Sequence, residues 1–257
     1  MSDENCKAEA KLIGDRATGF QTGNTEHKWD LNALRDSHKI LAEYVYEKKP
    51  IVKGYAGRTL YVDLTTKEIR EIPVTEDMKK KFTGGRGFGL KLLWDSIKPS
   101  TRWDSDENGL VLTAGPMCGS TQYPGFGKSL ALSVSPSTDI ICDSNAGGYY
   151  APYMKFCGFD AIQVHGKADE DVIVLIDGVE GKVRIETAPG EETNSHVLAE
   201  QLTHLYAFED TEKGKQGVAV VSAGTGAENS YWGCLNISFY DIRRKVARLK
   251  QHGRGGL

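Results

Sequence analysis

The chain of 257 residues lacks closely spaced cysteine pairs, long apolar runs and blocks of one charge sign. Its five cysteines are far apart, which excludes a self-contained zinc or iron–sulfur site and a disulfide framework. No run of about 18 apolar residues and no secretory leader pattern occurs, so we expect a cytoplasmic protein without a membrane span. The 32 basic and 35 acidic residues form no basic stripe, and we expect no nucleic-acid partner.

Glycine, in contrast, is abundant, with 29 residues. Between Gly115 and Ala168, glycine clusters alternate with β-rich runs around Lys128 and Asn145. Because glycine has no Cβ, such loops let the backbone approach a large, flat, phosphorylated ligand. The clusters GGRGFG and GTGAEN both lack the Gly-x-Gly-x-x-Gly spacing, so a dinucleotide site of the Rossmann type is not predicted.

The first 53 residues differ in pattern from the rest of the chain. Residues 1–29 are polar and without period, whereas apolar residues recur at helical spacing between Asp30 and Glu47. The recurring positions are Leu31, Leu34, His38, Leu41 and Val45. Asp30 can cap this segment, which predicts an amphipathic helix of about four turns. We expect residues 1–53 to be an extension whose helix packs on a partner or a neighbouring domain.

We expect residues 54–257 to form one α+β domain, which is a β-rich base of mixed sheets with hairpins and flanking helices. Two hairpins are predicted, over 58–74 and 172–186, and strands over 109–114, 130–134, 161–164 and 217–222. Helices are predicted from about 76 to 97 with a break at Gly84 and Gly85, and over 149–156, 195–207 and 241–250. Hairpin, helix and strand recur in the same order in both halves, a hint of internal pseudo-duplication.

Four segments together resemble one family: GGRGFGLKLLWD from Gly84, SNAGGYY from Ser144, GTGAEN from Gly224 and GRGG from Gly253. They stand in the order found in the N-terminal domain of tungsten-containing aldehyde:ferredoxin oxidoreductases. The resemblance covers roughly residues 54–257. It implies a β-rich base beneath two molybdopterins, whose dithiolenes hold tungsten or molybdenum and whose phosphates are bridged by Mg²⁺.

By this resemblance, Asn145 stands at a magnesium ligand and Gly147 at a pterin contact. An amide oxygen is a hard donor suited to Mg²⁺. Without the resemblance, Asn145 would be read as a cap of the turn before Tyr149.

The C-terminal segment KQHGRGG is similar to the family's loop around the second pterin. There Lys250 stands at a family arginine, Gln251 at a backbone carbonyl that ligates magnesium, and Gly253 and Arg254 at cofactor contacts. The resemblance therefore implies that Asn145 and Gln251 converge on one magnesium ion. The basic residues between 243 and 254 are otherwise a solvated helix face.

Two roles are possible for each of the basic residues Lys128 and Arg86. Lys128 stands where family members carry an arginine that bonds both a pterin and the iron–sulfur cluster, and a lysine cannot bridge the two bidentately; its alternative is a solvated loop lysine. Arg86 is either a cofactor-facing cation or part of a turn. His165 and His252 are expected to be packed, Cys118 and Cys157 to be core thiols.

The family reaction is oxidation of an aldehyde to a carboxylate, with electrons passing through a four-iron four-sulfur cluster to ferredoxin. The cluster ligands and acid–base residues belong to helical domains that have no counterpart here, and no catalytic residue is assigned. We therefore expect this chain to act as part of a longer or split enzyme, with those domains or a complementing subunit as partner, ferredoxin as electron acceptor, and an oligomeric assembly. The alternatives are the tungsten subunit of a benzoyl-CoA reductase and a non-enzymatic binding module.

Overall fold

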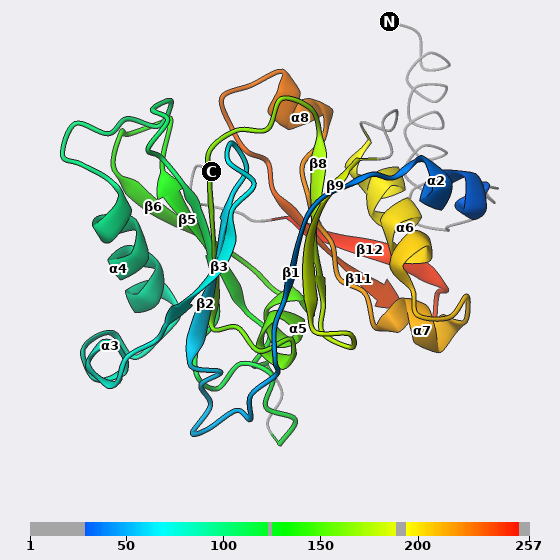
Figure 1. The fold of residues 1–257 in the computed structure, drawn as a ribbon, viewed down its shortest axis with the longest axis horizontal. Helices are drawn as coiled ribbons and strands as arrows, with labels where there is room; N and C mark the ends of the chain where they lie inside the picture. Colours follow the sequence, from blue (N-terminus) through cyan, green and yellow to red (C-terminus); the bar gives the residue numbers. More distant parts are fainter. Residues whose placement is uncertain (1–28, 123–124, 189–193, 252–257) are drawn as a thin grey trace, which may run out of the picture.

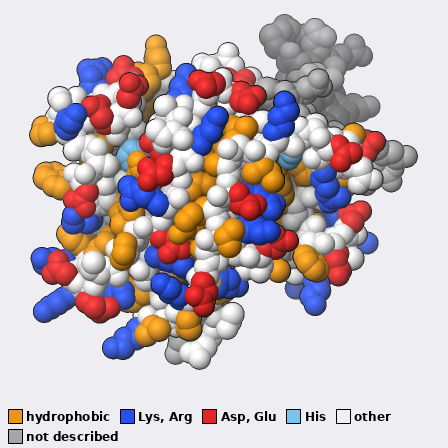
Figure 2. All heavy atoms as spheres, viewed as in Figure 1, with side chains coloured by type: hydrophobic (Ala, Val, Ile, Leu, Met, Phe, Trp, Pro, Cys, Tyr) orange, Lys and Arg blue, Asp and Glu red, His pale blue; other side chains and the backbone are white. Residues whose placement is uncertain are grey.

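The computed structural model describes residues 29–122, 125–188 and 194–251, which form three sheets with flanking helices (Figure 1). The α+β, β-rich fold class is thereby confirmed. Among the described residues no helix is long and apolar enough to cross a membrane. On the face drawn in Figure 2, acidic and basic side chains are interspersed.

The largest sheet has six strands in the order β3-β2-β7-β4-β5-β6. The strands are β2 (Arg58–Asp63), β3 (Ile69–Pro73), β4 (Leu110–Thr113), β5 (Ser129–Val134), β6 (Ile141–Ala146) and β7 (Ala161–His165). Among the described strands of this sheet, only β2 and β7 pair in parallel. The predicted first hairpin is confirmed as β2 and β3, whereas β6 was missed, because its sequence ICDSNA carries polar residues that are rare in strands.

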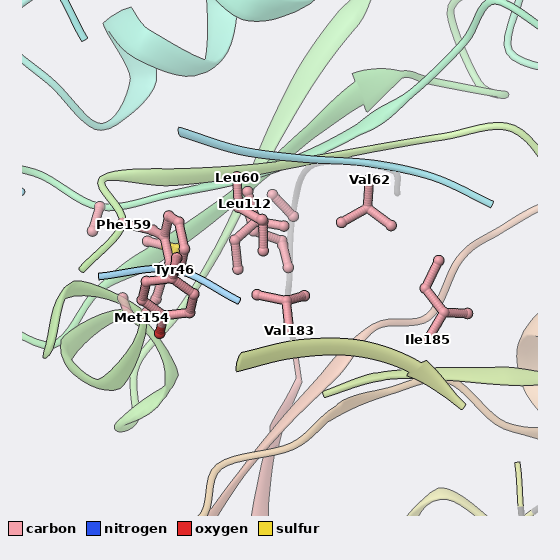
Figure 3. Packing of buried hydrophobic residues seen from close by; sticks show 12 residues of the cluster. Tyr46, Leu60, Val62, Leu112, Met154, Phe159, Val183 and Ile185 are labelled. Atoms are coloured by element: carbon pink, nitrogen blue, oxygen red, sulfur yellow. The ribbon is translucent and has the colours of Figure 1, made fainter. Parts of the chain in front are cut away.

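Each face of this sheet packs against a different layer. Leu92 and Leu93 of α4 (Arg86–Ser96) cover Val111 on one face, near α3 (Glu76–Phe82). The neighbouring Leu112 points to the other face, as alternation along a strand requires. Figure 3 shows it packed toward Val183 of the second sheet. The predicted break between the two helices at Gly84 and Gly85 is confirmed.

The second sheet corrects the prediction for the N-terminal segment. The prediction of one helix from Asp30 to Glu47 is wrong beyond its first turns. Helix α2 spans Leu31–Ser37, and Ile40–Val45 forms strand β1. Strand β1 pairs antiparallel with β9 (Lys182–Thr187), which pairs with β8 (Val172–Asp177). Hydrogen bonds to β9 outweigh the helical spacing, since Ile40 and Val45 are β-branched and favour extended backbone.

The third sheet corrects the C-terminal prediction. Residues 241–250 are not a helix; a turn after Asp241 leads into strand β12 (Val246–Gln251), which pairs with β11 (Asn236–Asp241). The strand β10 (Val221–Ser222) is shorter than predicted, and it pairs with β11. The helices predicted over 149–156 and 195–207 are confirmed as α5 (Tyr150–Phe156) and α6 (Ser195–Tyr206). Two short helices that were not predicted follow, α7 (Glu212–Gln216) and α8 (Thr225–Glu228).

The order of hairpin, helix and strand recurs along the chain, but the two hairpins join different sheets. The hairpin of β2 and β3 belongs to the six-stranded sheet, and that of β8 and β9 pairs with β1.

A buried ion pair fixes the start of β2 against α5 and β7. Lys155 and Asp160 are both 1 % exposed and in direct contact. Asp160 accepts hydrogen bonds from the backbone N–H groups of Ala56 (3.1 Å) and Gly57 (2.7 Å), and Lys155 donates to the carbonyl of Gly54 (3.1 Å). Both charges are therefore compensated, as buried charges must be.

We expect Asp160→Ala to lower the free energy of unfolding by about 3–5 kcal/mol, because it leaves the Lys155 charge buried and uncompensated. Urea unfolding followed by circular dichroism measures the loss. Asp77→Ala is the matched control: Asp77 pairs with Lys81 at the surface, and this pair is worth at most about 1 kcal/mol. Equal losses in the two variants would contradict the role given to the buried pair.

Candidate cofactor-binding face

Asn145 lies on the exposed part of strand β6, an edge strand of the six-stranded sheet. It stands directly opposite Leu130 of β5, which packs on the same face as α4. Its neighbours Ser144 and Ala146 are buried toward the other face. The amide of Asn145 is thus presented to solvent on the side of the sheet that carries α4.

Arg86, at the first position of α4, forms an ion pair with Asp143 of β6, with 2.8 Å between Nη2 and Oδ2. This hydrogen bond raises the pKa of Arg86. Asp143 lies two residues before Asn145 and therefore on the same face. The pair brings Arg86 to the strand that carries Asn145.

The glycines of GGRGFG serve the packing of α4 on the sheet. Gly85, the N-cap, has a φ of +53°, a conformation that glycine adopts without strain. A Cβ on Gly89 would lie 2.4 Å from Leu132 Cδ1. Close contact between helix and sheet thus requires glycine at position 89, and the backbone conformation favours glycine at position 85.

The loops before β5 and after β6 touch through their backbones. A Cβ on Gly127 would lie 2.7 Å from the carbonyl oxygen of Gly148, whereas Gly147 has open space at its Cβ position. Lys128, next to Gly127, is exposed. The adjoining ends of the paired strands β5 and β6 therefore carry the exposed Lys128 and Asn145 and the open Gly147.

The same loop rests against strand β11. A Cβ on Gly148 would lie 3.2 Å from Ile237 Cγ2, and the rings of Tyr149 and Phe239 are 5.5 Å apart. In β12, Lys250 pairs with Ile237 and Gln251 pairs with Asn236. The loop after Asn145 and the strand carrying Lys250 and Gln251 thus contact the same strand.

The other predicted site residues, Gly253 and Arg254, lie outside the described residues, as does His252. For Lys250 and Gln251 the backbone alone is described. The basic residues from Arg243 to Lys250 lie on a turn and a strand rather than on a helix, and Arg244 and Arg248 both contact Asp241.

The packed role predicted for His165 is confirmed. The ring is buried, contacts the side chain of Gln163 at 2.8 Å and stacks on Tyr61, and burial lowers its pKa. Burial also raises the pKa values of Cys118 and Cys157 to about 11. Both thiols therefore stay protonated at neutral pH and are poor metal ligands.

A hollow of about 270 Å³ lies among Met117, Cys118, Phe156 and their neighbours, and it is lined by none of the predicted site residues. Within the described ranges, no group of three or more His, Cys, Asp or Glu side chains could hold a metal ion.

The sequence reasoning missed two residues of this face, Asp143 and Gly127. Asp143 stands two positions before Asn145, a spacing that places both on one face of a strand, but β6 was not predicted. The contact of Gly127 with Gly148 joins two loops, and no local signal reveals it. The glycine cluster GTGAEN, for which no dinucleotide site was predicted, contains the one-turn helix α8.

Comparison with known proteins gives a consistent result. The family model for the N-terminal domain of aldehyde ferredoxin oxidoreductase matches residues 59–257 of this chain. The tungsten-containing aldehyde ferredoxin oxidoreductases of Pyrococcus horikoshii and Pyrococcus furiosus are 35 % and 33 % identical over 176 residues. That alignment covers 68 % of this chain and 28 % of each relative.

Two further relatives have different described activities. The WOR-like subunit of an aliphatic sulfonate oxidoreductase from Pyrococcus furiosus is 30 % identical, covering 68 % of this chain and 29 % of that protein. Among solved structures, the active site complex BamBC of benzoyl coenzyme A reductase, with 1,5-dienoyl-CoA, matches with a TM-score of 0.65 and 28 % identity. The match covers 79 % of this chain and 28 % of that chain.

Two alanine substitutions test which glycine of this face is closely packed and which has open space around it. Gly127→Ala is expected to destabilise the fold by about 1–3 kcal/mol, because the new methyl group forces the backbone of Gly148 to move. Gly147→Ala meets no atom and is expected to leave the urea midpoint unchanged. A large loss of stability in Gly147→Ala would show that its loop is packed rather than open.

Proposed function

The chain belongs to the aldehyde ferredoxin oxidoreductase family, and from this membership we propose that residues 54–257 bind a tungsten bis-pterin cofactor. The observation that carries the proposal is the exposed Asn145 beside the open backbone of Gly147, on a loop that touches β11. Residues 1–53 are proposed to be an extension of this domain.

Two neutral oxygens are proposed to hold the Mg²⁺ ion of this group. Mg²⁺ prefers oxygen ligands, and amide and carbonyl oxygens can serve where phosphates supply the negative charge. The amide oxygen of Asn145 and the backbone carbonyl of Gln251 are proposed as those ligands. The open space at Gly147 permits the close approach of a planar ring system.

Cations beside the same face are proposed to neutralise phosphate. Lys128 is exposed, and Lys250 and Arg254 follow from the resemblance. Arg86 is held by Asp143, and an exposed ion pair of this kind contributes little stability. Arg86 can therefore exchange this carboxylate for a phosphate oxygen at small cost. Gly253 is proposed as a further backbone contact.

The cofactor, when bound, supplies the two-electron chemistry, while the protein supplies binding and electrostatics. Lys128 supplies a compact positive charge, whereas the arginine of the family supplies a planar guanidinium that can form two parallel hydrogen bonds. We therefore expect the pterin to be held at this position while its contact with an iron–sulfur cluster is altered.

The reaction proposed first is oxidation of an aldehyde to a carboxylate, with ferredoxin as electron acceptor. The chain spans about 28 % of the length of its curated relatives, so substrate binding and electron transfer are proposed to require further polypeptide. Reduction of an aromatic thioester is the second candidate, favoured by the likeness to the benzoyl coenzyme A reductase complex. A cytoplasmic oligomer is proposed in both cases.

Metal and pterin content tests the proposal without relying on activity. We expect the natural full-length polypeptide, purified from cells grown with tungstate, to contain tungsten and pterin by mass spectrometry. Asn145→Ala is expected to retain about tenfold less of both, the scale of loss when a metal-site partner is removed. Asn32→Ala, at an exposed helical position, is the control and should retain both. A stable, folded wild type free of metal and pterin would support the binding-module alternative.

A further inference from the structure

The hollow of about 270 Å³ lies between two loops and the end of α5. Ile51 and Gly54 line it from the loop before β2, Met117 and its neighbours from the loop after β4, and Phe156 from α5. Figure 1 shows both loops at the lower end of the view, beside α5. Among the described residues that line the hollow, none is charged.

Close contacts hold the walls of the hollow together. A Cβ on Gly54 would lie 2.3 Å from the carbonyl oxygen of Pro116, so the two loops touch through their backbones. A Cβ on Gly119 would lie 3.0 Å from the ring of Phe156. The carbonyl of Gly54 also accepts a hydrogen bond from Lys155, a member of the buried ion pair. The hollow is therefore part of the packed fold.

Large apolar side chains around the hollow are exposed. Ile51, Met117 and Phe156 are 42 %, 50 % and 46 % exposed, and the neighbouring Val52 is 62 % exposed. Exposed apolar side chains gathered at one place mark interaction sites on soluble proteins. The volume lies below the range of about 300–1,000 Å³ that is typical of small-molecule sites, so the hollow suits one or two apolar side chains of a polypeptide.

The charged residues around the hollow are basic. Lys49 and Lys53 flank Ile51, and both are exposed and form no ion pair within the described part of the chain. At the border, Glu76 of α3 is already bonded to Lys79, with 2.7 Å between Oε1 and Nζ. The chain has 35 acidic residues, yet Asp and Glu are absent from the three sequence segments that form the walls, 48–62, 108–138 and 144–159. Acidic groups are therefore attracted to this lysine-flanked hollow.

We propose that the lysine-flanked hollow docks the further polypeptide that the proposed function requires, and the inference rests on that function. The alignment covers only 28 % of each curated relative, so those proteins carry further polypeptide. The docking segment supplies an apolar side chain that enters the hollow and acidic residues that meet Lys49 and Lys53. A second copy of this chain fits less well, because it would place lysine against lysine.

Peptide selection tests the chemistry of the docking segment. A random peptide library displayed on phage is selected on the full chain of 257 residues. The enriched sequences are expected to share an aliphatic or aromatic residue flanked by Asp or Glu. A synthetic peptide with these shared residues should bind more weakly as the salt concentration rises, because salt screens exposed charges.

Met117→Asp tests whether the peptide occupies the hollow. The variant should weaken binding of the synthetic peptide about tenfold, the scale expected for losing the burial of one large apolar side chain. Phe208→Asp is the matched control, since Phe208 is 80 % exposed and does not line the hollow. Its affinity should equal that of the wild type. Circular dichroism confirms that both variants are folded.

Charge reversal tests the two lysines. The double variant Lys49→Glu, Lys53→Glu should remove the weakening of peptide binding by salt, because it removes the attraction that salt screens. The control reverses two exposed lysines that lie elsewhere, Lys167→Glu and Lys213→Glu. This control should bind the peptide with the salt dependence of the wild type.

The natural enzyme, purified with all its polypeptides, should not bind the peptide, because its own further polypeptide occupies the hollow. Three results would overturn the proposal: enriched peptides without acidic residues, equal affinity of Met117→Asp and the wild type, or peptide binding to the natural enzyme as tight as to the chain alone. Binding of the chain to phosphatidylglycerol vesicles, with no peptide enriched, would also overturn it, in favour of a lipid surface. Tungsten and pterin content reports separately on the proposed function, so each proposal can fail without the other.

Discussion

The carboxylate of Asp160 is the contact on which the surrounding structure depends. It holds the N–H groups of Ala56 and Gly57 and the ammonium of Lys155, and so it joins the start of β2, the end of α5 and the start of β7. Arg58 extends this centre, because its guanidinium bonds Glu71 and the carbonyls of Glu47 and Gly158. A buried network of this kind specifies one arrangement, since each charge left without its partner is costly.

The position of the candidate face follows from that arrangement. Helix α5 is fixed at its C-terminal end by Lys155, and its N-terminal end begins directly after the loop of Gly147 and Gly148. The close approach of Gly148 to Gly127 and to Ile237 then joins this loop to β5 and β11. The glycines here differ in their surroundings: Gly127 permits contact between two backbones, whereas Gly147 has open space at its Cβ position.

The segment Trp29–Tyr46, which precedes the family match, adds a further layer to this domain. Its apolar end, Tyr46, packs on Phe159 in the core, and its polar end is fixed by His38, Glu186 and Tyr206. Residues that precede the family match thus pair with β9, a strand that lies within the match.

The sequence by itself determined the local hairpins, the break before α4, the short helix α5 and the family, because turn residues, periodicity and glycine motifs are local signals. Only the tertiary structure decided that residues 40–45 and 246–251 are strands, that Arg86 bonds Asp143, and that Gly127 meets Gly148. These features rest on contacts between distant segments. A strand gains its hydrogen bonds from a partner, and helical spacing in one segment carries no information about whether that partner lies beside it.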